Sequence, residues 1–92
     1  MTMPEFNPKV QAAIYDVLDN QLRDEDPPET KQTLERLLAA GIERGEARRL
    51  IACIIAGEIF SVLKTSTAFD RERFVGRLSL LPEMPWMDDE PQ

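Results

Sequence analysis

The chain contains no histidine and only one cysteine, Cys53, among its 92 residues. Without histidine it lacks both the usual general base of hydrolytic catalysis and the commonest metal ligand. A single cysteine forms no disulfide within one chain, and zinc sites need clusters of cysteine and histidine. Because Cys53 lies inside the longest apolar run, Leu50 to Ala56, we expect a small core residue rather than a reactive thiol.

Glycine and long hydrophobic runs are also scarce. The four glycines are scattered, so the chain offers no glycine-rich loop that could cradle a phosphate. The longest apolar run is far too short to span a bilayer. Residues 1–10 do not show the basic start and apolar stretch of a signal peptide. The sequence therefore predicts a cytoplasmic protein that does not associate with membranes.

The formal net charge is −6, from 17 acidic and 11 basic residues. Residues 82–92 hold four of the acids and no base, which leaves 13 acids against 11 bases, or −2, for residues 1–81. Such a surface repels nucleic acid and anionic membranes at long range. We expect one helical domain over residues 1–82, an acidic C-terminal tail over residues 83–92, and no nucleic acid partner.

Apolar residues recur at spacings of three and four, and no alternating strand pattern interrupts them. This pattern predicts four helices, over about residues 8–22, 27–40, 44–64 and 70–81. The third helix is apolar on nearly every side around residues 50–56, so it should be the central one. Its apolar surface comprises Ala47, Leu50, Ile51, Ile54, Ile55, Ile59, Val62 and Leu63. The expected fold class is all-α, a compact four-helix bundle or an orthogonal helical array.

Capping residues support these boundaries. Asn7, Asp26 and Asp70 are good N-caps for the first, second and fourth helices, and Glu29 follows Asp26 at the spacing of a capping box. Gly41 is placed to end the second helix in the left-handed conformation. Phe69 and Phe74 have the spacing of a hydrophobic staple at the start of the fourth helix.

Glu58 is the most unusual single residue, because it lies four after Ile54 and four before Val62 on the apolar stripe of the third helix. A carboxylate there must be paired, hydrogen-bonded or protonated. One interpretation is a buried ion pair, or a glutamate at the stripe edge that reaches water. The other is a carboxylate that contacts a small ligand or a metal in a pocket between helices. Gly57 beside it would let another helix approach closely, or would leave a small cavity.

The arginines form two groups, one at the start of the third helix and one in the fourth. They are Arg44, Arg48 and Arg49, and Arg71, Arg73 and Arg77. Pairing with the chain's own acids is favoured over a basic groove for an acidic partner or phosphate. Phe74 is the one aromatic residue among these arginines, and it is expected on the inward face of the fourth helix, so the sequence does not indicate the stacking platform of a single-strand binder. The acidic stretch from Asp16 to Glu29 lacks the central glycine and ligand spacing of a calcium loop.

Met84, Trp86 and Met87 form an apolar cluster after the fourth helix. Trp86 either packs back on the body or belongs to a surface for a partner. Because no reaction has its residues assembled, we expect a non-enzymatic module without a cofactor, which binds a partner protein or itself. The alternative is a protein that binds a small ligand or metal through Glu58 and nearby carboxylates.

Several caps and core positions are shared with a known group of proteins. They are Asn7-Pro8 with Val10, Asn20-Gln21-Leu22 leading into Asp26-Pro27-Pro28-Glu29-Thr30, Thr33 to Leu37, Glu46-Ala47, Leu50-Ile51, Glu58-Ile59, Phe69-Asp70 before Arg73-Phe74, and Leu81-Pro82. Over about residues 7–82 the chain resembles a family of short bacterial all-helical proteins of unknown function. The resemblance implies a fold rather than an activity. Members of that family often place histidines near the positions of Glu46 and Arg49, where this chain has none.

Overall fold

The structure, a computed structural model, describes residues 8–66 and 68–84. These residues form four α-helices and no strand: α1 (Pro8–Asp24), α2 (Pro28–Ala39), α3 (Arg44–Thr65) and α4 (Arg71–Leu80). The predicted all-α class is confirmed, and each predicted helix end lies within two residues of the observed one. None of the helices in this part of the chain is long and apolar enough to cross a membrane.

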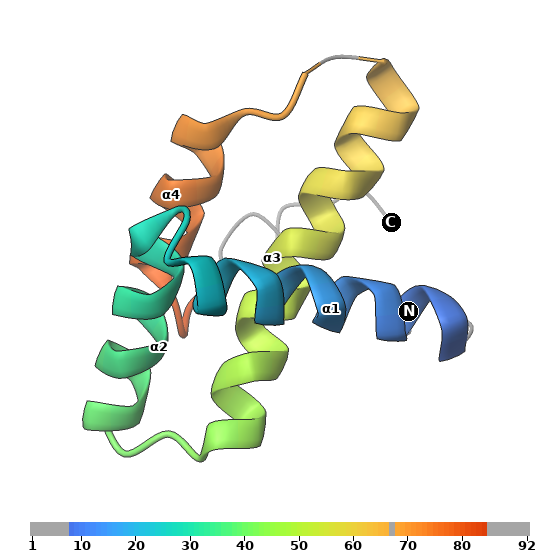
Figure 1. The fold of residues 1–92 in the computed structure, drawn as a ribbon. Helices are drawn as coiled ribbons and strands as arrows, with labels where there is room; N and C mark the ends of the chain where they lie inside the picture. The colour runs from blue at the N-terminus through green and yellow to red at the C-terminus, as the bar shows by residue number, and fades with distance from the viewer. Residues whose placement is uncertain (1–7, 67, 85–92) are drawn as a thin grey trace.

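The arrangement centres on α3, which is the longest helix (Figure 1). α1 runs across α3 rather than alongside it, and α2 and α4 lie on one flank. α1 packs against α2 and α3, while α4 packs against the same two helices. The C-terminal half of α3 extends beyond the crossing with α1 before the chain turns back into α4 (Figure 1).

The hydrophobic core draws on every helix, and α3 supplies most of it, as predicted. The buried apolar residues of α3 are Ala47, Leu50, Ile51, Ala52, Ile54, Ile55 and Ala56. The other helices and the turn after α4 add Ile14, Leu18, Leu34, Leu37, Phe74, Leu78 and Leu81. Burial of these side chains is the main force that holds crossing helices together.

The start of α2 differs from the prediction. Asp26 is not its N-cap, because the helix begins at Pro28 and Pro27 occupies the cap position without a side-chain hydrogen bond. Proline disfavours helical geometry in the residue before it, and Pro27 accordingly has ψ 149°. The expected capping box with Glu29 is therefore wrong. The carboxylates of Asp26 and Glu29 instead lie 3.7 and 3.6 Å from the Arg71 guanidinium.

Other predicted boundaries are confirmed in atomic detail. Gly41 has φ +91°, and the N–H of Ile42 donates to the carbonyl of Leu37 at 3.1 Å, as in a Schellman motif. Asp70 caps α4 by accepting a 2.9 Å hydrogen bond from the N–H of Arg73. The ring centroids of Phe69 and Phe74 lie 5.5 Å apart, as a hydrophobic staple requires. The predicted cap Asn7 lies outside the described residues.

Arg36 joins the C-terminal end of α4 to α2. Its guanidinium donates to the main-chain carbonyls of Leu81 at 2.8 Å and Leu78 at 3.0 Å. The last carbonyls of a helix have no partner within the helix, so a cation that binds them there is stabilising. This contact, together with buried Leu81, fixes the end of α4 against α2.

Two glycine substitutions test the boundary assignments. Gly41→Ala should lower the free energy of unfolding by about 1 kcal/mol, because alanine strains the left-handed conformation. Gly57→Ala should raise it by about 0.5–1 kcal/mol, because Gly57 is an exposed helix position with no atom within 4 Å of an added Cβ. Urea denaturation of the two variants measures both changes. Equal effects would contradict the assignment of Gly41 as a left-handed helix end.

Candidate functional site

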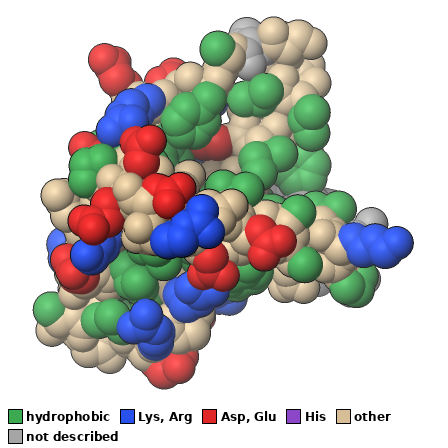
Figure 2. All heavy atoms as spheres, viewed as in Figure 1, with side chains coloured by type: hydrophobic (Ala, Val, Ile, Leu, Met, Phe, Trp, Pro, Cys, Tyr) green, Lys and Arg blue, Asp and Glu red, His purple; other side chains and the backbone are tan. Residues whose placement is uncertain are grey.

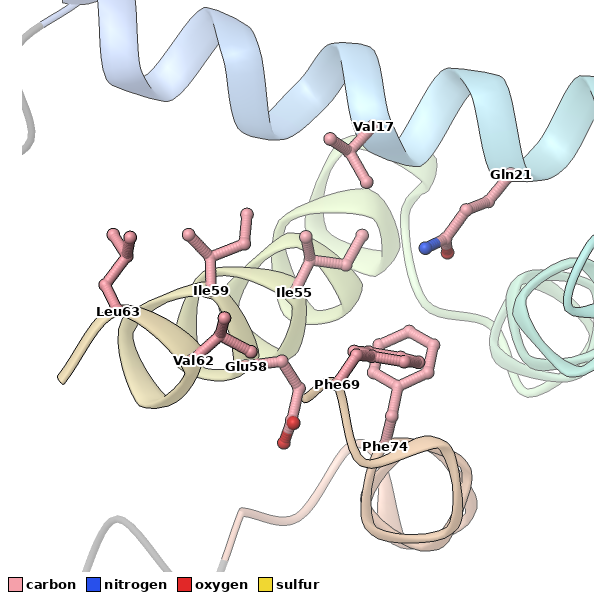
Figure 3. Close-up of a pocket in the computed structure, with 9 residues that line it drawn as sticks. All are labelled: Val17, Gln21, Ile55, Glu58, Ile59, Val62, Leu63, Phe69 and Phe74. Carbon is pink, nitrogen blue, oxygen red and sulfur yellow. The ribbon is translucent and has the colours of Figure 1, made fainter. Parts of the chain in front are cut away.

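An apolar groove of about 360 Å³ lies between α1, the C-terminal half of α3 and the start of α4. Its lining residues are Val17, Gln21, Ile55, Glu58, Ile59, Val62, Leu63, Phe69 and Phe74 (Figure 3). Seven of these nine are apolar, and the two polar ones are Gln21 and Glu58. Ligand sites of this size are commonly lined by hydrophobic side chains with a few placed polar groups.

The groove exists because the apolar stripe of α3 continues past the helices that cover it. Ile59 and Leu63 belong to the predicted apolar surface of this helix, yet they are 39% and 72% exposed. Phe69, on the opposite rim, is 49% exposed. Figure 2 shows hydrophobic side chains gathered along this end of α3 beside a hollow. Contiguous exposed apolar surface of this kind is typical of binding sites.

Glu58 lies in the wall between α3 and α4 and is 2% exposed. Arg73 binds it with two hydrogen bonds of 2.9 Å, from Nε to Oε2 and from Nη2 to Oε1. Arg77 approaches Oε2 at 3.8 Å, and Nη2 of Arg73 also donates to the Ser61 hydroxyl at 3.0 Å. The hydrogen bonds to Glu58 raise the pKa of Arg73 above its usual value. This is the two-pronged geometry in which arginine binds carboxylates most strongly.

The geometry of Glu58 distinguishes between its two sequence-based interpretations. The residue is buried and ion-paired, as the first interpretation expected. Its carboxylate points away from α1, whereas Ile55 and Ile59 point toward it (Figure 3). A ligand or metal that bound this carboxylate would have to displace Arg73. Among the described residues, no group of three acidic, cysteine or histidine side chains could hold a metal ion.

Gly57 does not play the part expected of it. The sequence suggested that another helix approaches closely at this position or that a small cavity remains beside it. Gly57 is instead exposed, and an added Cβ would meet no atom within 4 Å. The reason is rotational: Glu58 turns toward α4, and the preceding residue therefore faces solvent.

Gln21 is a site residue that sequence reasoning missed. Its Oε1 accepts a 2.8 Å hydrogen bond from the hydroxyl of Thr30, which is fully buried. Its Nε2 is turned toward the groove (Figure 3). A signal was present, because Gln21 follows Val17 by four residues on the apolar face of α1. Phe69 was predicted as a staple residue, but not as a rim of this groove.

The remaining predicted residues are distributed around the fold. Five of the six grouped arginines pair with the chain's own acids: Arg48 with Asp19, Arg49 with Glu46, Arg71 with Asp26 and Glu29, and Arg73 and Arg77 with Glu58. This confirms the favoured interpretation of both groups. Met84 is half-buried against the core. Trp86 and Met87 lie outside the described residues.

Comparisons of the chain with protein-family models, with curated proteins and with solved structures find no match. The resemblance to short bacterial helical proteins therefore stays an expectation.

Removing Arg73 should destabilise the fold because it leaves a buried carboxylate without its main partner. We expect Arg73→Ala to lower the free energy of unfolding by about 2 kcal/mol, since Arg77 and partial exposure offset some of the loss. Arg71→Ala is the matched control, because its ion pairs are longer and solvent-exposed, and should cost less than about 1 kcal/mol. Urea denaturation measures both. A loss for Arg71→Ala as large as that for Arg73→Ala would contradict the special role of the Glu58 pair.

Cys53 should react slowly in the folded protein. Burial raises the pKa of the Cys53 thiol, and the nearby Arg49 only partly offsets this. Less thiolate is then present at neutral pH, and the thiolate is the reactive form. Alkylation by iodoacetamide near neutral pH should be on the order of tenfold slower in the native protein than in urea. Equal rates in the two states would show that the fold does not shield this residue.

Proposed function

We propose that this chain is a non-enzymatic protein-interaction module that holds an apolar segment of a partner in the groove between α1, α3 and α4. The observation that supports this most directly is the exposure of the groove's rims. Leu63 and Phe69 stand on opposite sides and leave 72% and 49% of their surface in water. A macromolecular partner would cover both rims at once and remove that apolar surface from water. The proposal places the module in the cytoplasm, as the sequence predicts.

The electrostatics of the site support a binding role over a catalytic one. The buried carboxylate nearest the groove, Glu58, is held by two short hydrogen bonds to Arg73. A general base or nucleophile must instead be free to reach its substrate. The pairing of arginines with the chain's own acids likewise weighs against nucleic acid, which binds through unpaired basic surface.

A small ligand in the same groove is the second candidate. The volume of about 360 Å³ lies within the range of small-molecule pockets. Such pockets cover most of a ligand's surface, however, and this groove leaves its rims open. The two candidates separate experimentally, because a small ligand raises the melting temperature without adding a chain to the complex.

Leu63→Glu tests the proposed function by placing a charge on the more exposed rim. The mutant should retain the fold, because the side chain is largely in water already, and should lose partner capture by at least about tenfold. Leu80→Glu is the matched control, since Leu80 is an exposed leucine too, with 49% of its surface in water, but does not line the groove. Quantitative affinity capture from a lysate of the source cells compares the wild type with both variants. Partners lost equally from both variants, or from neither, would contradict a groove-dependent module.

A further inference from the structure

The chemistry of the groove restricts the partner further, in an argument that rests on the proposed function. Gln21 is the only uncharged polar side chain among the described residues that line the groove. Because Thr30 is buried and donates to Oε1 at 2.8 Å, the amide is held in one orientation with Nε2 toward the groove. Among the described residues, the hydrogen bond that holds the Gln21 amide is the one from Thr30 to Oε1, which leaves Nε2 to donate to water or to an occupant of the groove. An occupant that covers the groove must therefore supply an acceptor there.

Charge restricts the occupant as well. Glu58 is the only charged residue in the described lining of the groove, and the Arg73 guanidinium balances its charge. The rest of the lining is apolar apart from Gln21, so a charged group pressed into the groove would lose water without finding a counterion. A lysine or arginine of the partner that lay opposite Gln21 would also place its own N–H donors against the Nε2 donor. The contacting face of the partner must accordingly be uncharged.

The shape of the groove fits a helix. Two of its walls are helix faces, with Val17 and Gln21 four apart on α1 and Ile55 and Ile59 four apart on α3. The ridges of a third helix can pack between such faces when its apolar side chains recur every three or four residues. The exposed rims, at Leu63 and Phe69, would then contact the flanks of that helix.

We infer that the groove binds an amphipathic helix of a partner protein that carries a neutral acceptor residue, Asn, Gln, Ser or Thr, within its apolar face. That residue accepts a hydrogen bond from Nε2 of Gln21. The formal charge of −6 on this chain favours a helix with neutral or basic flanks. A second copy of the chain would bring another −6 and is disfavoured for that reason.

Selection from a display library of random peptides of about 16 residues, long enough to form a helix, tests this inference. The baits are the full-length wild type, Gln21→Glu, Leu63→Glu and the control Leu80→Glu. Gln21→Glu keeps an oxygen for the Thr30 hydroxyl but replaces the Nε2 donor with a charged acceptor. Circular dichroism and thermal melting verify that each bait is folded.

The wild type and Leu80→Glu should enrich peptides with apolar residues at helical spacing and one neutral acceptor among them. In fluorescence anisotropy, replacing that acceptor by lysine should weaken binding to the wild type on the order of tenfold. For Gln21→Glu the preference should invert, with the lysine peptide binding more tightly. Leu63→Glu should weaken the binding of every selected peptide.

Each contrary outcome has its own meaning. If Leu63→Glu weakens the binding of the selected peptides but Gln21→Glu leaves it unchanged, the inference is overturned and the proposed function stands. A monomer–dimer equilibrium that Leu63→Glu abolishes, measured by light scattering, would assign the groove to a second copy and overturn the inference. Failure to enrich groove-dependent peptides overturns the inference. If lysate capture is also groove-independent, the proposed function falls with it.

Discussion

The apolar surface of α3 is the constraint on which the rest of the structure depends. Around residues 50–56 this helix is apolar on nearly every side, so no single neighbour can shield it from water. α1, α2 and α4 each pack against a part of it. They are shorter than α3, however, and they leave Ile59, Phe60 and Leu63 near its C-terminal end exposed. Crossing the central helix, rather than lining it, lets α1 cover the middle and leaves the end of α3 open.

The same constraint explains how the groove and the ion pair come to lie together. Where α3 leaves the crossing, its stripe divides: Ile59 turns toward α1, and Glu58 turns toward α4. The apolar branch forms one wall of the groove. The charged branch joins α4 to α3 through the ion pair of Glu58 with Arg73. The ion pair between Glu58 and Arg73 therefore holds α4 in position beside the groove.

Much of the fold could be predicted from the sequence, because amphipathic helices have apolar residues at regular spacings and their ends have characteristic capping residues. The apolar spacing located all four helices of the described chain, and Gly41 and Asp70 marked true ends. The prediction of where α2 starts was wrong because two preferences compete at Asp26-Pro27-Pro28. The capping preference of aspartate pointed to one residue, and the restriction before proline moved the helix by one.

The candidate site was only partly predictable. That Glu58 must be paired followed from its place on the stripe, but its partner could not be chosen among six arginines without the crossing geometry. The groove itself depends on how far α3 extends beyond its crossing with α1. No local sequence pattern specifies where two helices cross. Gln21 escaped notice because its significance comes from Thr30, which orients the amide from another helix.

α4 is attached through Arg36 at its C-terminal end and through the Glu58 pair near its start, and these two contacts place different constraints on sequence variation. Arg36 binds main-chain carbonyls, which every residue at positions 78 and 81 supplies. That join asks for conservation at position 36 alone. The pair at the other end needs a specific side chain on each helix. Among relatives of this chain, positions 58 and 73 should therefore change together, in charge reversal or in joint replacement by apolar residues, while arginine should persist at position 36 whichever residues stand at positions 78 and 81.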